Sequence, residues 1–214
     1  MEPDVSPDAL LMDVGFVILG ITWDAIEAYD AATGSAIAGP PDEGHRRPIP
    51  PPGDPSTAEQ YWSEVAEASG LDGARELMRR LAETVPDLMF DDGALSLMED
   101  ARRAGRRVGI LSNDAYGFIG RSFFDGRPEF ALAEVFIDST DIGARKPEPA
   151  AYLAAANALA VAPERIVFLD DTPACTAGAN AVGMVGIDVD PFDSAPAFDR
   201  ARELLGLGAT GGGR

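Results

Sequence analysis

The sequence predicts an α/β protein: a Rossmann-like parallel sheet with helices on both faces, plus a small, mostly helical insert after the first strand. Three observations predict this class. Short apolar runs of the kind that form buried strands alternate with helical segments along most of the chain. The 214 residues are enough for one such domain and a modest insert. Between the first run and the return of this alternation, residues 20–90 have a helical and proline-rich pattern.

Residues 10–19 form an apolar run with a single carboxylate, Asp13, in its middle. Because both faces of the run are apolar, it is typical of a strand buried within a parallel sheet. We expect the strand to stop at Asp13, since Gly15 can adopt backbone angles that other residues avoid. A charge in such a run is costly unless it is paired or lies at the strand's end, where open parallel sheets bind ligands. Asp13 is therefore a candidate functional residue, the alternative being a carboxylate that caps a turn.

The insert is expected to contain three helices and one long loop. Residues 23–33 predict the first helix, which ends near a glycine. Residues 35–55 carry too many prolines for a helix and favour an extended loop, which is either a lid or binding segment or a plain surface connection. A capping box from Ser56 to Glu59 opens the second helix, and residues 72–84 form the third.

From residue 91 onward the sequence alternates between helices and strands, which indicates a parallel sheet covered on both faces. Helices are expected at residues 92–105, 116–124, 147–159, 173–182 and 195–205, and strands at 108–111, 135–137, 166–169 and 184–188. The predicted organisation is a core of residues 1–19 and 91–205, the insert of residues 20–90, and a disordered glycine-rich tail of residues 206–214.

The composition excludes several classes of function. The net charge of −19 argues against binding to nucleic acid or to an anionic membrane, whose phosphates would be repelled. No apolar run approaches the roughly 20 residues that span a membrane, the first residues lack a basic signal-peptide region, and a cytoplasmic location is expected. One cysteine, Cys175, permits no intrachain disulfide, and one histidine, His45, argues against His-based triads and metal sites. We therefore expect chemistry based on carboxylates, with a locally positive site for any phosphate.

Further polar groups follow other apolar runs and loops of the chain. They are Ser112-Asn113, Lys146 in an Arg-Lys-Pro-Glu-Pro sequence, and Asp170-Asp171. Together with Asp13, in this order and spacing, they resemble the four motifs of the haloacid dehalogenase superfamily of phosphatases and related hydrolases. The resemblance covers residues 8–190, and its third and fourth motifs are the most specific. The first motif departs from the usual Asp-x-Asp-Gly of the phosphatases, since Gly15 occupies the position of the second Asp and Phe16 that of the Gly.

The resemblance implies a nucleophile and a metal site. Asp13 would be the nucleophile, forming an aspartyl-phosphate that water later hydrolyses. Asp13, Asp171 and the backbone carbonyl of Gly15 would hold Mg²⁺, a cation that prefers oxygen ligands. In this family an insert after the first strand is the cap that covers the active site, so residues 20–90 are expected to form a small helical cap.

The other motif residues would supply positive charge and hydrogen-bond donors, which the attack of a carboxylate on a phosphate requires. Ser112 and Asn113 would hold phosphate oxygens, although both residue types also favour plain helix caps. The resemblance implies that Lys146, the only lysine in the chain, neutralises nucleophile and phosphate; a solvated lysine is the alternative. Adjacent carboxylates at a buried strand end need a cation nearby, so Asp170 is expected to pair with Lys146 as part of the catalytic site. Cys175 stands where relatives carry Asn or Asp and is not expected to be a nucleophile.

These residues favour a Mg²⁺-dependent phosphatase, a hydrolase of phosphoric monoesters, whose partner is a small phosphorylated metabolite. Gly15 cannot serve as the general acid that protonates a leaving alcohol, so turnover would be slower or need a good leaving group. Asp114 and Glu27 are candidate replacement donors by position. Two alternatives stay open: a non-catalytic binder of a phosphorylated ligand or protein, and a 2-haloacid dehalogenase, against which the Asp170-Asp171 pair counts. The sequence carries no signature of the particular substrate or of the oligomeric state.

Overall fold

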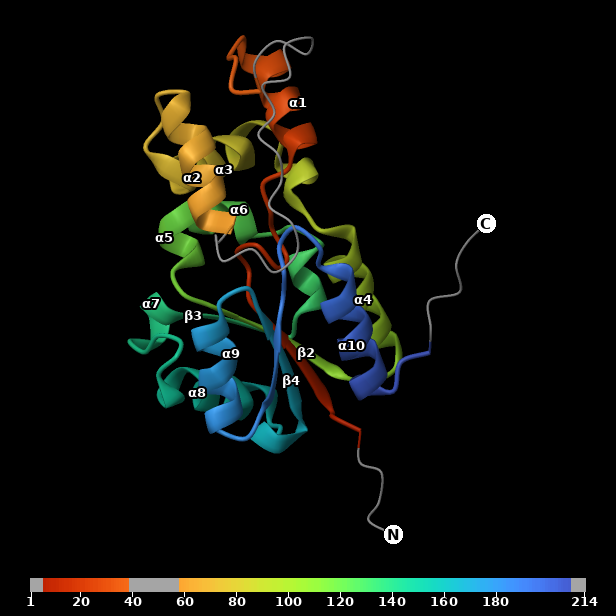
Figure 1. The fold of residues 1–214 in the computed structure, drawn as a ribbon. Helices are drawn as coiled ribbons and strands as arrows, with labels where there is room; N and C mark the ends of the chain where they lie inside the picture. Colours follow the sequence, from red (N-terminus) through yellow and green to blue (C-terminus); the bar gives the residue numbers. More distant parts are fainter. Residues whose placement is uncertain (1–5, 39–57, 209–214) are drawn as a thin grey trace.

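The computed structural model describes residues 6–38 and 58–208, and at its centre lies a five-stranded parallel sheet with the strand order β3-β2-β1-β4-β5 (Figure 1). The predicted fold class is confirmed. Among the described residues, no helix is both long and apolar enough to cross a membrane. The proline-rich residues 39–55, the capping residue Ser56 and most of the predicted tail lie outside the described residues.

The strands of the sheet are short and their ends align at one edge. They are β1 (Ala9–Met12), β2 (Arg107–Ser112), β3 (Val135–Asp138), β4 (Ile166–Asp170) and β5 (Val185–Asp188). All of β1 is buried, because this central strand is covered on both faces. Met12 lies opposite Ile110 of β2 and Leu169 of β4. The segments that follow these three strands therefore meet at the same edge of the sheet.

Two pairs of helices cover the two faces of the sheet (Figure 1). One face carries α4 (Asp92–Arg103) and α10 (Ala195–Leu205), and the other carries α8 (Pro149–Leu159) and α9 (Pro173–Ala181). Each face has its own cluster of buried apolar side chains. The molecule is thus built from three layers in which the sheet lies between the helices.

The buried stripe of α4 differs by one position from the stripe of Leu95, Met98 and Ala101 that its sequence predicts. Leu95 is only half-buried, whereas Leu97 is fully buried. The buried positions of α4 are Ala94, Leu97, Met98 and Ala101. This stripe follows the i, i+3, i+4, i+7 spacing of an amphipathic helix, and Leu95 lies at its margin.

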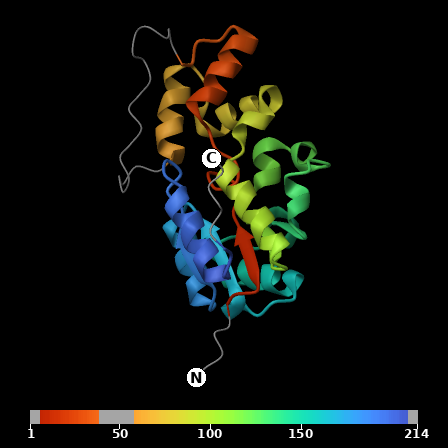
Figure 2. The ribbon, with the colours of Figure 1, turned by 90° about the vertical axis from the view of Figure 1, so that its right-hand side faces the viewer.

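The helices of the insert pack together beyond the carboxyl ends of the strands (Figures 1 and 2). They are α1 (Trp23–Thr33), α2 (Ala58–Ala68), α3 (Gly73–Thr84) and the short 3-10 helix η1 (Pro86–Met89). An edge-to-face contact between Trp23 and Trp62, with ring centroids 5.4 Å apart, joins α1 to α2. Helix α3 also packs against the helix that follows β2. The division of the chain into core and cap stays a prediction.

The segment after β2 contains two short helices where the sequence predicts one over residues 116–124. They are α5 (Ala115–Ile119) and α6 (Arg121–Phe124). Gly120 between them has a φ of +100°, which glycine adopts at low cost and which a continuous helix excludes. The 3-10 helix η2 (Phe130–Leu132) then leads into β3.

A further short helix, α7 (Ser139–Ile142), follows β3 and is absent from the sequence prediction. The buried carboxylate of Asp138 caps it, accepting the backbone N–H of Thr140 at 2.9 Å. Asp138 also accepts the backbone N–H of Tyr116 at 3.1 Å, which ties the start of α5 to β3. The 3-10 helix η3 (Pro163–Arg165) precedes β4.

Candidate active site

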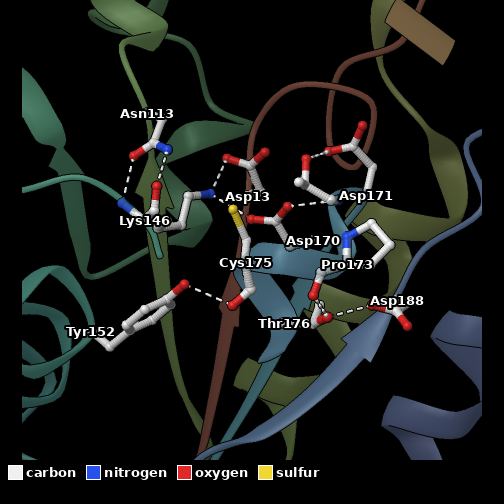
Figure 3. A network of polar contacts seen from close by, with 11 residues as sticks. Asp13, Asn113, Lys146, Tyr152, Asp170, Asp171, Pro173, Cys175, Thr176 and Asp188 are labelled. Atoms are coloured by element: carbon white, nitrogen blue, oxygen red, sulfur yellow. Dashed lines mark hydrogen bonds and ion pairs between the residues drawn. The ribbon is translucent and has the colours of Figure 1, made fainter. Parts of the chain in front are cut away.

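The strand ends bring the predicted site residues together (Figure 3). β1 stops at Met12 as expected, so Asp13 is the first residue beyond the central strand. Asp170 ends β4 and Asp171 follows it. The register of the parallel strands places these ends side by side, so the cluster follows directly from the order β2-β1-β4 in the sheet.

Lys146 lies between two of these carboxylates. Its Nζ is 2.7 Å from Asp13 Oδ1 and 2.6 Å from Asp170 Oδ2, and its side chain is 2% exposed. The backbone of Lys146 is fixed by Asn113, whose amide accepts its N–H at 2.9 Å and donates to its carbonyl at 2.8 Å. Lys146 therefore pairs with Asp170, as the sequence predicts. Both hydrogen bonds of the Asn113 side chain go to the backbone of Lys146.

Asp13, Asp170 and Asp171 form an acidic cluster in which one carboxylate oxygen of each lies within 4.8 Å of the others. Asp170 is the most engaged of the three, since its Oδ1 accepts the backbone N–H of Thr172 at 2.9 Å and its Oδ2 faces Lys146. Asp13 and Asp171 both line the cavity described below, which Asp170 does not. Hard carboxylate oxygens at this separation fit a Mg²⁺ ion.

The charges of this cluster are strongly perturbed. Burial, opposed by Lys146 and reinforced by Asp170, raises the pKa of Asp13 to about 6. Burial and the neighbouring Asp13 and Asp170 raise the pKa of Asp171 to about 8. Burial alone would lower the pKa of Lys146, but the two carboxylates beside it raise that pKa instead. The protein therefore holds one positive charge against three acidic groups, an arrangement that a divalent cation would neutralise.

A cavity of about 160 Å³ opens in front of Asp13. From the core it is lined by residues that include Asp13, Gly15, Phe16, Ser112, Asn113, Asp171 and Thr172. Residues from the insert line the other side: Glu59 of α2, and Arg75 and Met78 of α3. Phe16 has a φ of +56°, rare for a residue with a large side chain, so the chain here adopts the backbone that a glycine would adopt at low cost. Of the predicted site residues, Asp13, Gly15, Ser112, Asn113 and Asp171 line this cavity, whereas Lys146 and Asp170 are not part of its wall.

Two residues named as replacement proton donors do not line this cavity. Asp114 turns its carboxylate toward Gly117, so closely that a Cβ at position 117 would collide with it. Glu27 lies on α1 and is not part of the cavity wall either. Glu59 and Arg75 do line it, and sequence analysis missed both as site residues. Each lies in the first turn of a helix, where Glu59 is part of a capping box and Arg75 of no motif. The packing of α2 on α3, and of α3 against α5, brings them over the strand ends.

Cys175 is buried beside the cluster but is not part of it. Burial, together with the nearby Asp170, raises its pKa to about 12, which keeps the side chain a neutral thiol at ordinary pH. The Tyr152 hydroxyl donates to the backbone carbonyl of Cys175 at 2.7 Å (Figure 3). This environment supports the expectation that Cys175 is not a nucleophile.

Comparison with known proteins places the chain in a family. A haloacid dehalogenase-like hydrolase family model matches residues 53–183. Phosphatase MT3486 of Mycobacterium tuberculosis is 39% identical over 93 residues, which cover 44% of this chain and 43% of that protein. Enolase-phosphatase E1 of Frankia alni is 35% identical over 134 residues, which cover 60% of this chain and 56% of that protein. The matched segments thus span about half the length of these relatives.

The fold agrees with solved structures of the same family. A HAD phosphatase from Thermococcus onnurineus has a TM-score of 0.57 and 21% identity, covering 95% of this chain and all of that one. A HAD-superfamily hydrolase from Ehrlichia chaffeensis has a TM-score of 0.56 and 17% identity, and the match covers 94% of this chain and 98% of that one. At these identities the likeness concerns the fold, while the family assignment comes from the sequence match. The chain belongs to the haloacid dehalogenase-like hydrolases.

Proposed function

We propose that this protein is a Mg²⁺-dependent phosphatase that hydrolyses a small phosphorylated metabolite through an aspartyl-phosphate. The observation that carries the proposal is the placement of Asp13 at the cavity, 2.7 Å from a buried lysine and beside Asp171. A carboxylate can attack a phosphate only where nearby positive charge offsets the repulsion. The relatives named as phosphatases support the same class of reaction.

Each residue of the site has its own role in the proposed reaction. A carboxylate oxygen of Asp13 forms a bond to phosphorus as the bond from phosphorus to the leaving oxygen breaks, and water then releases phosphate from Asp13. Lys146 would hold Asp13 in place and offset its charge, while Ser112 and the backbone at Asn113, which line the cavity, would donate hydrogen bonds to phosphate oxygens. Asp13, Asp171 and the Gly15 carbonyl would hold Mg²⁺, which supplies positive charge for the phosphoryl group when it is bound.

The leaving oxygen receives no proton from residue 15. Gly15 has no side chain, and the other acidic groups of the cavity wall are Asp13, Asp171 and Glu59 among the described residues. General acid catalysis contributes about 10²- to 10⁴-fold where it operates. We therefore expect rapid hydrolysis of esters with good leaving groups, such as p-nitrophenyl phosphate, and slow hydrolysis of alkyl phosphates.

The test is release of phosphate from p-nitrophenyl phosphate and a panel of phosphorylated metabolites, with Mg²⁺ and with EDTA. Asp13→Asn should abolish release, whereas Asp199→Asn, an exposed acid on α10, serves as the matched control. Metal-dependent release that is lost only in Asp13→Asn supports the phosphatase. If no ester is hydrolysed, the proposal is wrong and a non-catalytic binder is favoured. Halide release from 2-haloacids in EDTA would identify a dehalogenase instead.

A further inference from the structure

Among the described residues that line the cavity, Arg75 is the one with a positive charge. The other charged residues of the wall are Asp13, Asp171 and Glu59. Lys146 lies behind Asp13, buried between two carboxylates, and belongs to the reacting end of the cavity. Arg75 comes from α3 on the side of the insert, which lies beyond the carboxyl ends of the strands (Figure 1). Among the described residues, Arg75 thus supplies positive charge to the cavity wall on the side of the insert, while Lys146 is buried against Asp13 on the side of the strand ends.

The guanidinium of Arg75 stacks on an aromatic ring. Its Cζ lies 3.9 Å from the ring centroid of Phe118 in α5, and Phe118 also lines the cavity. Stacking of this kind orients a guanidinium while leaving its N–H edge available for hydrogen bonds. Because α3 packs against α5, this contact also fixes the insert helix over the core.

The only ion-pair partner of Arg75 among the described residues is Glu59, and the pair is weak. Arg75 Nε lies 3.7 Å from Glu59 Oε1, beyond hydrogen-bond distance, and both side chains are more than half exposed. Exposed pairs of this kind contribute about 0–1 kcal/mol. An incoming anion can therefore replace Glu59 as the partner of Arg75 at small cost.

We propose that Arg75 binds a second anionic group of the substrate, so that the protein acts on short phosphorylated molecules that also carry a carboxylate. A planar guanidinium binds a carboxylate through two parallel hydrogen bonds. A cavity of about 160 Å³ has room for a short carbon chain, since a volume of about 150 Å³ holds a molecule the size of benzene. Arg75 is thus a specificity-determining residue, and the assignment of a substrate class rests on the proposed phosphatase activity.

The test compares two esters that differ by one carboxylate, 2-phosphoglycolate and ethyl phosphate. The wild-type protein should have the higher kcat/KM for phosphoglycolate, and Arg75→Gln should reduce this preference about 10- to 100-fold, the effect of losing hydrogen bonds to a charged group. Arg79→Gln is the matched control, because Arg79 lies one turn further along α3 and pairs with Glu83 at 2.8 Å, outside the cavity wall. Phosphoglycolate with no advantage over ethyl phosphate in the wild type, or an equal advantage in Arg75→Gln, would overturn the inference.

Glu59→Gln should change the preference for phosphoglycolate in the direction opposite to Arg75→Gln. Removal of its charge frees Arg75 and reduces repulsion, so the KM for phosphoglycolate should fall several-fold while that for ethyl phosphate changes less. A general loss of folding would not produce opposite shifts in Arg75→Gln and Glu59→Gln. A rise in the KM for phosphoglycolate in Glu59→Gln would contradict the competition between Glu59 and the substrate for Arg75.

Direct binding separates this inference from the proposed reaction. Calorimetry on the Asp13→Asn protein should show tighter binding of phosphoglycolate than of ethyl phosphate, and the added Arg75→Gln change should remove the difference. If the wild type hydrolyses neither ester but this binding difference is present, the phosphatase proposal fails and the role of Arg75 stands. If esters are hydrolysed but neither turnover nor binding depends on Arg75, the phosphatase stands and the role of Arg75 is refuted.

Discussion

Gly15 lies at the cavity beside the proposed nucleophile, at the position where phosphatases of the family carry a second acid. A Cβ at position 15 would meet no heavy atom within 4 Å, and the φ of Gly15 lies outside the left-handed region that disfavours side chains. Gly15→Asp should therefore fold and supply the missing proton donor. We expect kcat for alkyl phosphates to rise about 100-fold, the lower range of general acid catalysis, with a smaller gain for p-nitrophenyl phosphate. Steady-state kinetics with an alkyl phosphate and with p-nitrophenyl phosphate measures the two changes in kcat.

Gly15→Asn is the control for this substitution, since it adds a side chain of the same shape without an acid. It should leave alkyl phosphate turnover near the wild-type level. An equal gain in Gly15→Asp and Gly15→Asn would show that the side chain acts by shape or backbone restriction. No gain in either would mean that proton transfer to the leaving group does not limit turnover.

Lys146 is the second residue whose replacement has a defined outcome. Its ammonium group is buried between Asp13 and Asp170, at 2.7 and 2.6 Å. Lys146→Met removes that charge and leaves two buried carboxylates facing each other, which should destabilise the fold by about 3–5 kcal/mol and abolish phosphate release. Chemical denaturation measures the loss. Adding Asp170→Asn should recover part of the stability but none of the activity; a double variant as unstable as the single one would contradict this account.

Apart from Lys146, which the Arg-Lys-Pro-Glu-Pro sequence indicated, the site residues predicted from sequence are those whose position is fixed by a strand end. Asp13 and Asp170 each follow an apolar run, and parallel strands bring such ends to one edge of the sheet. Arg75 and Glu59 were not predicted as site residues, because their contact with the cavity depends on how α2 and α3 pack over the core. Local sequence patterns report on burial and helix ends but carry no signal for such a tertiary approach.

The cap of α4 is a feature at the scale of the secondary-structure elements. Asp91 Oδ1 accepts the backbone N–H groups of Gly93 and Ala94 at 2.8 and 3.0 Å. Its other oxygen accepts the hydroxyl of Ser194 at 2.8 Å, just before α10 begins. One carboxylate therefore starts α4 and links it to the helix that shares its face of the sheet.

Asp91→Ala should lower the free energy of unfolding by about 1–2 kcal/mol, because it removes the cap of α4 and the bond from Ser194. Ser194→Ala removes only the second contact and should cost less. Asp92→Ala, an exposed residue of the first turn, is the matched control. Thermal or chemical denaturation of the three variants gives the order. A loss in Asp91→Ala no greater than in Asp92→Ala would refute the capping role.

At this scale the sequence predicted the long elements better than the short ones. The helix α10 has the predicted bounds, since its apolar spacing and its terminal glycine define both ends. The break at Gly120 and the helix α7 were missed. The break depends on the φ of +100° that Gly120 adopts, which a single glycine in a helical pattern does not reveal. The helix α7 begins at the buried Asp138, which accepts the backbone N–H of Thr140 and, from a distant part of the chain, that of Tyr116.

The acidic charge of the whole chain sets the conditions under which the site can work. At a net charge of −19 the protein repels anions in general, so an anionic substrate needs local positive charge to bind. Lys146, Arg75 and a bound cation would supply that charge in the described cavity. The same self-repulsion acts on the folded state, and the acidic cluster at the strand ends concentrates it in one place.

The metal-free protein should therefore lose stability as the pH rises from about 5 to 8.5. The pKa values of Asp13 and Asp171 are about 6 and about 8 in the folded chain, against 3.8 for the ordinary group. Because the folded state holds protons that the unfolded state has released, these groups stabilise the fold at low pH, and this contribution is lost as the pH passes through the folded pKa values. The raised pKa of Lys146 lies above this range and does not oppose the trend.

Mg²⁺ should reverse this loss, because it binds the ionised carboxylates and competes with protons for them. In EDTA the melting temperature should fall between pH 5 and pH 8.5, and Mg²⁺ should raise it much more at pH 8.5 than at pH 5. Asp171→Asn removes the group with the higher pKa, so the fall in EDTA should shrink and the rise with Mg²⁺ should largely disappear. Asp199→Asn, exposed on α10, should behave as the wild type. A rise with Mg²⁺ that is equal at both pH values, or that persists in Asp171→Asn, would mean that the cation binds elsewhere on this acidic surface.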